Sequence, residues 1–199
     1  MSRVPFSRED WLTIPNLITL VRLLLLIPIC YLLAVDAKPG LTAVLLVIFG
    51  STDWIDGYIA RKYDQVSTVG EIIDPIADRL GLGLIAIFLV VGHHLPDWVA
   101  YCIIVTDLCL AALYLFFKGK YRAKVNYLGK VRTAILMVGL PLTVFGRIEE
   151  LSFLGTVGVI AASVGAILHV ITGGTYAHAI VQEHRATKAN LEASGTTEK

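Results

Sequence analysis

The stretch from Asp53 to Asp78 reads DWIDGYIAR, then eight residues, then GEIIDPIAD. It contains four aspartates, Asp53, Asp56, Asp74 and Asp78, in which the first pair is spaced three residues apart and the second pair four. Residues three or four apart share a face of an α-helix. The spacing therefore predicts two carboxylate pairs, each presented on one face of its own helix.

Both pairs adjoin apolar runs that are long enough to enter a bilayer. A carboxylate at the centre of a transmembrane helix costs roughly 2.5–3.5 kcal/mol on insertion scales, so four bare ones would cost on the order of 10 kcal/mol. Bound divalent cations would neutralise them, and oxygen-only ligands suit Mg²⁺ or Mn²⁺. The alternative is a transporter in which the carboxylates line an ion or proton pathway, but that alternative leaves Gly57, Gly70 and Ala60-Arg61 unexplained.

The composition indicates an integral membrane protein with a single domain. Hydrophobic residues make up 56% of the 199 residues and charged residues 17%, against about a quarter charged in soluble domains; the mean hydropathy is +0.71. Cys30, Cys102 and Cys109 stand apart in apolar runs without metal-binding spacing, so we expect them to be packing residues.

Six apolar runs predict an all-α protein with six transmembrane helices, near residues 14–35, 41–60, 71–91, 98–117, 129–145 and 153–172. Asn16, Thr19 and Arg22 recur at a spacing of three in the first run, which predicts a polar stripe that faces the protein interior.

The last run carries Gly158, Ala162 and Ala166, a pattern of small residues suited to helix packing. We expect Gly173-Gly174 to break or bend this helix before His184. The predicted organisation is a six-helix domain over residues 1–182 and a polar, disordered tail over residues 183–199.

The distribution of basic residues predicts the orientation in the membrane. With both termini in the cytoplasm, thirteen of the seventeen lysines and arginines lie inside, and only Lys38 and Arg147 lie outside. The aspartate stretch then opens to the cytoplasm, and the predicted location is the plasma membrane.

The aspartate stretch also resembles a family signature. It matches the motif D-x2-D-G-x2-A-R-x8-G-x3-D-x3-D of the CDP-alcohol phosphatidyltransferases at all eight fixed positions: Asp53, Asp56, Gly57, Ala60, Arg61, Gly70, Asp74 and Asp78. The opening IPNLITLVR, from Ile14, is similar to the start of phosphatidylglycerophosphate and cardiolipin synthases, and the resemblance places Asn16 and Arg22 near the active site.

The resemblance implies a role for each motif residue. Metal binding, by two ions of Mg²⁺ or Mn²⁺, would fall to Asp53, Asp56, Asp74 and Asp78, and Asp78 would also be the general base. The residues implied to contact the CDP-lipid and its nucleotide are Gly57, Ala60, Arg61, Asp64 and Gly70. Small residues suit a close approach of backbone to ligand.

The acceptor site is implied by a second segment. Gly129-Lys130-Val131-Arg132-Thr133 resembles the G-K-x-K-T segment of phosphatidylglycerophosphate synthases, in which the lysine contacts the acceptor phosphate. We therefore expect Lys130 and Arg132 to bind the acceptor. Arg79 would hold a phosphate or pair with an aspartate. The basic residues Lys118, Lys120, Arg122 and Lys124 are expected to contact anionic headgroups.

One departure from the resemblance bears on the acceptor. Those enzymes carry arginines on the fourth helix, where this chain has Thr106-Asp107 and Tyr114. A singly charged phosphodiester acceptor such as phosphatidylglycerol would need fewer cations than glycerol 3-phosphate, a dianion.

The predicted function is thus a phosphatidyltransferase of phospholipid biosynthesis that uses CDP-diacylglycerol and releases CMP. Its product would be cardiolipin from phosphatidylglycerol, or phosphatidylglycerophosphate from glycerol 3-phosphate. The alternatives are an acceptor such as inositol phosphate, a Mg²⁺-dependent membrane prenyltransferase, or a transporter. The expected partners are lipids and a second copy of the chain in a homodimer, with no nucleic acid.

Overall fold

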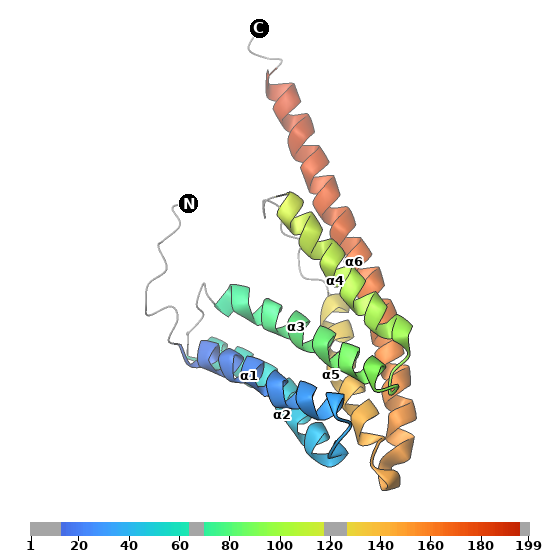
Figure 1. The fold of residues 1–199 in the computed structure, drawn as a ribbon. Helices are drawn as coiled ribbons and strands as arrows, with labels where there is room; N and C mark the ends of the chain where they lie inside the picture. The colour runs from blue at the N-terminus through green and yellow to red at the C-terminus, as the bar shows by residue number, and fades with distance from the viewer. Residues whose placement is uncertain (1–12, 64–69, 118–126, 196–199) are drawn as a thin grey trace.

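The computed structural model describes residues 13–63, 70–117 and 127–195, and over these ranges it is all-helical without strands, as predicted (Figure 1). Its elements are α1 (Ile14–Ala34), α2 (Pro39–Lys62), α3 (Gly70–Val91), α4 (Asp97–Phe116), α5 (Tyr127–Phe145), the short 3₁₀ helix η2 (Glu149–Leu151) and α6 (Ser152–Gly195). The predicted spans therefore fall on the six long helices in order.

Local sequence explains where the first two helices begin. Thr13 caps α1, and its hydroxyl accepts a hydrogen bond from the Asn16 backbone N–H at 3.4 Å. Pro15 and Pro39 occupy the first turns of α1 and α2. Proline is favoured there because its missing N–H has no partner within the helix.

Five of the described helices are long and apolar enough to cross a membrane: α1, α2, α4, α5 and α6. Many of their large apolar side chains are exposed, such as Ile27, Leu115 and Phe116. An apolar exterior of this extent is the surface expected of a protein solvated by lipid. α3 is of similar length, but its first half carries Asp74, Asp78 and Arg79.

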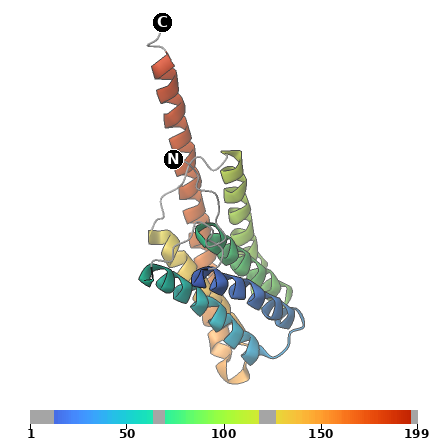
Figure 2. The same ribbon diagram turned by 90° about the vertical axis from the view of Figure 1, so that its left-hand side faces the viewer.

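The helices form two groups that meet along α2 and α3. α1 packs against α2 and α3, and α6 packs against α4 and α5. Between the groups, α2 packs against α5, and α3 contacts α4 and α5. Figures 1 and 2 show α1, α2 and α3 crossing beside the steeper α4, α5 and α6. The shared core includes Ile29, Leu46, Leu89, Ile103, Leu136 and Leu140. α3 therefore presents side chains to both groups.

α5 and α6 approach each other through small residues. A Cβ at Gly158 would overlap the backbone of Thr143, and one at Gly139 would lie 2.8 Å from the backbone nitrogen of Ala162. Ala162 and Ala166 are fully buried. The prediction that this small-residue face packs against another helix is confirmed, and its partner is α5 of the same chain.

The predicted break at Gly173-Gly174 is wrong. α6 runs without interruption to Gly195, well beyond the other helices (Figure 2). Gly173 instead allows a close approach of α6 to α4, because a Cβ there would overlap the side chain of Thr106.

The disordered tail predicted from residue 183 is likewise wrong as far as Gly195. The segment after Ile180 is rich in Ala, Glu, Gln, Lys and Arg. These residues have high intrinsic helix propensity, so the helix continues although the hydrophobic run has ended.

Candidate active site

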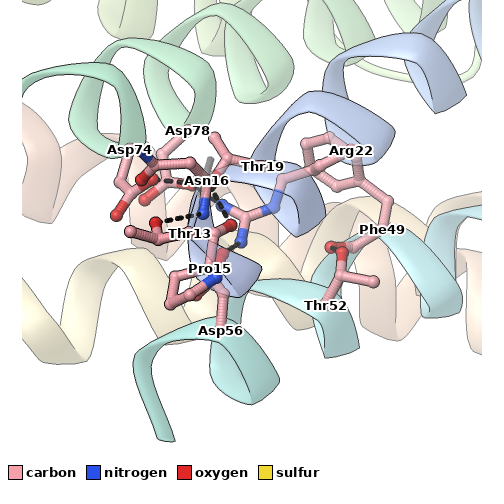
Figure 3. A network of polar contacts seen from close by, with 10 residues as sticks. All are labelled: Thr13, Pro15, Asn16, Thr19, Arg22, Phe49, Thr52, Asp56, Asp74 and Asp78. Atoms are coloured by element: carbon pink, nitrogen blue, oxygen red, sulfur yellow. Dashed lines mark hydrogen bonds and ion pairs between the residues drawn. The ribbon is translucent and has the colours of Figure 1, made fainter. Parts of the chain in front are cut away.

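The polar stripe of α1 points into the protein and meets the aspartates of the motif (Figure 3). Asn16, Thr19 and Arg22 are buried, as their spacing predicted, and Arg22 is completely enclosed. Arginine is almost never fully buried unless it is paired. The partners of Arg22 therefore indicate the role of the polar stripe.

Arg22 bridges the two halves of the motif. Its Nη1 donates to Asp78 Oδ1 at 2.6 Å, and its Nη2 donates to Asp56 Oδ2. Asp56 comes from α2 and Asp78 from α3. One guanidinium thus fixes two carboxylates that lie on different helices, and charge-assisted bonds of this kind are among the strongest in proteins.

Thr19 ties a third aspartate to the same helix. Its hydroxyl donates to Asp74 Oδ1 at 2.6 Å, which places Asp74 one turn of α1 away from the Arg22 contacts. We refer to Thr19, Arg22, Asp56, Asp74 and Asp78 as the Arg22 cluster (Figure 3). It contains three carboxylates and one guanidinium, and so carries an excess of negative charge.

The remaining motif residues are described in part. Asp53, Ala60 and Arg61 lie on α2, but their side chains are outside the described part of the chain, and Asp64 lies outside the described residues altogether. Gly57 lies on α2 one residue after Asp56, and Gly70 is buried at the first position of α3. The structure therefore brings Asp56, Asp74 and Asp78 together and leaves the location of the Asp53 carboxylate undescribed.

The Arg22 cluster has the donor chemistry of a Mg²⁺ or Mn²⁺ site. Its carboxylate oxygens are the ligands that these hard cations prefer. Among the described side chains, no three carboxylate, imidazole or thiol groups are gathered closely enough to hold a metal ion by themselves. The donor set fits such an ion in its chemistry, with Asp53 as the motif residue that would add to it.

A second polar cluster lies on the other side of α3. Arg79 follows Asp78 in sequence, yet its Nη1 reaches Asp107 Oδ1 on α4 at 3.2 Å. His169 on α6 places its Nε2 3.3 Å from the same oxygen, and its Nδ1 is contacted by Nη1 of Arg132 on α5. We call Arg79, Asp107, Arg132 and His169 the Asp107 cluster.

This arrangement shows an aspartate partner for Arg79 and separates the two predicted acceptor residues. Arg79 pairs with an aspartate outside the motif. Arg132 is buried, whereas Lys130 is exposed on the first turn of α5. Residues two apart on a helix do not share a face. The basic residues Lys118, Lys120, Arg122 and Lys124 lie outside the described residues.

Sequence reasoning did not single out Asp107 or His169 as site residues. Both are ionisable residues within apolar helices that are long enough to span a membrane. Such residues are rare in spanning helices and usually mark a functional site. That signal was present in the sequence, but the pairing of residues 107, 132 and 169 depends on how three helices pack.

The fold and the two clusters together define a helical membrane enzyme whose polar site is built inside the bundle. A family model described as CDP-alcohol phosphatidyltransferase matches residues 12–172, so the chain belongs to that family. Enzymes of this family act in phospholipid synthesis and generally depend on a divalent metal.

Two groups of relatives are similar over most of the chain. A Rickettsia felis protein named CDP-diacylglycerol--glycerol-3-phosphate 3-phosphatidyltransferase is 31% identical over 167 residues, which is 82% of this chain and 92% of the relative. A Mycobacterium tuberculosis (strain ATCC 25618 / H37Rv) protein named "Putative cardiolipin synthase" is 32% identical over 142 residues, 70% of this chain and 68% of the relative. The chain is thus a phosphatidyltransferase of phospholipid synthesis, and its relatives differ in the acceptor that their names indicate.

Proposed function

We propose that this enzyme transfers a phosphatidyl group from CDP-diacylglycerol to a glycerol-type acceptor and releases CMP. The observation that carries the proposal is the convergence of Asp56, Asp74 and Asp78, from two helices, on the buried stripe of α1. Displacement at phosphorus requires charge neutralisation on the pyrophosphate and an aligned attacking oxygen. A preorganised group of carboxylates that can hold divalent cations meets the first requirement.

In this proposal Asp53, Asp56, Asp74 and Asp78 hold two ions of Mg²⁺ or Mn²⁺. Bound there, the ions would supply positive charge to the pyrophosphate and its leaving group. Arg22 keeps Asp56 and Asp78 at a fixed separation, and Thr19 orients Asp74. The α1 stripe is thus the support on which the carboxylates are positioned.

Asp78 is proposed as the general base that takes the proton of the attacking hydroxyl. It is the motif aspartate whose neighbour in sequence, Arg79, reaches toward the second cluster, so α3 links the two. The proposed contacts to the nucleotide and its phosphates come from Gly57, Ala60, Arg61, Asp64 and Gly70.

Acceptor binding is proposed for Arg79, Lys130 and Arg132. Burial of Arg132 and its contact with His169 support a fixed cation that can receive a phosphate. The product is cardiolipin when phosphatidylglycerol is the acceptor and phosphatidylglycerophosphate when glycerol 3-phosphate is.

We further propose that the enzyme is a homodimer of the plasma membrane, with six spanning helices and cytoplasmic termini. The orientation is supported by the concentration of basic residues on one side of the predicted spans. Cysteines introduced at Ser67 and Arg122 should then be labelled from the cytoplasm, and one at Pro96 from outside. Labelling of Ser67 from outside would contradict this orientation.

The test of the reaction is release of CMP from CDP-diacylglycerol by the purified enzyme in detergent, with each glycerol-type acceptor added in turn. CMP release should stop with EDTA and return with Mg²⁺ or Mn²⁺. Neither a prenyltransferase nor a transporter would release CMP. Full activity in metal-free buffer would refute the proposed metal site, and no CMP with any acceptor would refute the reaction.

A further inference from the structure

The Asp107 cluster combines side chains from four helices at a site that the aspartate motif does not cover. Arg79 comes from α3, Asp107 from α4, Arg132 from α5 and His169 from α6. Arg132 is 9% exposed and His169 3%. Polar groups at this depth are retained only when they are paired or when they serve a ligand.

The pairing within the cluster is incomplete. Asp107 Oδ1, Arg132 Nε and His169 Nε2 are buried atoms without a hydrogen-bond partner in the described part of the chain, although Asp107 Oδ1 lies 3.2 Å from Arg79 Nη1 and 3.3 Å from His169 Nε2. Buried polar atoms are almost always satisfied, so the Arg132 Nε–H, which has no such contact, calls for an explanation. A polar ligand that accepts a hydrogen bond from this N–H would satisfy it.

The contacts of His169 indicate which of its ring nitrogens acts as the acceptor. Arginine has only donors, so the His169 Nδ1 that faces Arg132 must carry a lone pair. The imidazole is then neutral and carries its proton on Nε2, toward Asp107. With a neutral histidine, the cluster contains one aspartate and two arginines, the buried Arg132 and Arg79, which is 42% exposed in its side chain but in ion-pair contact with Asp107. This leaves an excess of one positive charge.

Lys130 does not add to this charge inside the cluster. It is exposed, and it lies two residues before the buried Arg132 on α5. Among the described residues, Asp107 forms an ion pair with Arg79 but none with Lys130. Charge balance at Arg79, Asp107 and Arg132 therefore favours a singly charged anion as the ligand. A phosphodiester carries one negative charge, whereas a phosphate monoester near neutral pH carries close to two.

We propose that Asp107 is a specificity-determining residue that sets the acceptor site to receive a phosphodiester headgroup, as in phosphatidylglycerol, over the dianionic glycerol 3-phosphate. By cancelling one of the two arginine charges, Asp107 lowers the attraction for a second negative charge. His169 is a positioning residue that holds the Arg132 guanidinium through Nδ1. This inference rests on the proposed phosphatidyl transfer and assigns its acceptor.

The first experiment changes the charge of the cluster at constant shape. In Asp107→Asn, the ratio of kcat/KM for glycerol 3-phosphate to kcat/KM for phosphatidylglycerol should rise about tenfold, the scale of one charge-assisted contact. Asp107→Glu keeps the charge and should keep the wild-type ratio. Asp97→Asn, on the exposed first turn of α4, removes a carboxylate outside the cluster and should also keep it.

The second experiment uses the unmodified enzyme, so it does not depend on whether a variant folds. With phosphatidylglycerol as the acceptor, glycerophosphoglycerol, the water-soluble diester headgroup, should inhibit cardiolipin formation at lower concentration than glycerol 3-phosphate does. Competition by glycerol 3-phosphate at equal or lower concentration would overturn the assignment. An unchanged ratio in Asp107→Asn, or the same change in Asp107→Glu, would overturn it as well.

These results are separable from a failure of the proposed function. If neither acceptor supports CMP release, the phosphatidyl transfer itself is wrong. If both support it but the ratio in Asp107→Asn does not move, the transfer stands and only the role of Asp107 is refuted.

Discussion

The two polar clusters on either side of α3 have opposite charge excess. The Arg22 cluster sets one guanidinium against three carboxylates, whereas the Asp107 cluster sets two guanidiniums against one carboxylate. Consecutive residues of α3 supply both, since Asp78 faces α1 and Arg79 faces α4. A single helix thus separates a site suited to cations from a site suited to a phosphate.

This difference suits the binding of two charged substrates by one small bundle. In the proposed function, the carboxylate side would need bound cations before a pyrophosphate can bind, whereas the arginine side would attract phosphate directly. Because the two sides adjoin along α3, an acceptor held by the arginines would have its hydroxyl near the proposed base. Substitutions that remove charge from each side in turn test this difference.

The largest effect is expected from the carboxylate side. Asp78→Asn should lower kcat by about 100- to 10,000-fold, the usual contribution of a general base, and should retain much of the CDP-diacylglycerol binding. Turnover measured with saturating substrates, together with equilibrium binding of the CDP-lipid, checks this. Asp97→Asn is the control, and near-normal turnover of Asp78→Asn would show that the base is another group.

The next effect concerns the charge that holds the carboxylates in place. Arg22→Gln leaves the buried Asp56 and the partly exposed Asp78 without their guanidinium. Loss of the buried partner of Asp56 should cost about 3–5 kcal/mol of stability. Added Mg²⁺ should raise the Tm of this variant more than that of the unmodified enzyme, because the cation takes over part of the neutralisation. Thermal unfolding in detergent with and without Mg²⁺ measures both. Equal Mg²⁺ responses would argue against cation binding beside Arg22.

Substitutions on the arginine side should have a smaller effect on catalysis, and the effect should differ between Arg132 and Lys130. Arg132→Gln should raise the acceptor KM about ten- to a hundredfold, with the KM for CDP-diacylglycerol nearly unchanged. Lys130→Gln removes an exposed charge and should raise the acceptor KM by less. Steady-state kinetics, with each substrate varied in turn, gives the KM values of the two variants for comparison. A larger effect of Lys130→Gln would move the acceptor phosphate from the bundle interior to the surface.

The smallest effect on stability is expected for a group of exposed ion pairs outside the spanning segments. This group serves as a reference for the buried clusters. Asp36 contacts His94 at 3.0 Å and also pairs with Arg147, and it is 61% exposed. The hydrogen bond from His94, followed by the charge of Arg147, lowers the pKa of Asp36 below its ordinary value of 3.8.

Because the pKa of Asp36 is lower in the folded protein, its ion pairs contribute fully to stability when the pH is above the ordinary pKa of an aspartate. That contribution is lost in the acid range, as the pH falls through the pKa of Asp36 in the folded protein. Asp36→Asn should therefore change stability by no more than about 1 kcal/mol at pH 7, as for exposed ion pairs. The difference between variant and wild type should shrink in acid. Tm values at several pH values check this, and a growing difference in acid would contradict the assigned sign.

Local sequence signals were enough to predict the helices and part of the candidate site. Hydrophobic runs and helix-starting residues located the six long helices, because both signals are local. The spacing of Asn16, Thr19 and Arg22 predicted a buried stripe, because a helix has a fixed period. The motif identified Asp56, Asp74 and Asp78 through short-range spacing that any helix would preserve.

The contacts between side chains of different helices depend on tertiary packing. The pairing of Arg22 with Asp56 and Asp78 spans 34 and 56 positions of the sequence, and the contact of Arg132 with His169 spans 37. Gly173, read locally as a helix breaker, proved to be a contact point between α6 and α4. Such contacts depend on how helices cross, which is set by the shape of whole faces, and a local pattern along one helix does not contain that information.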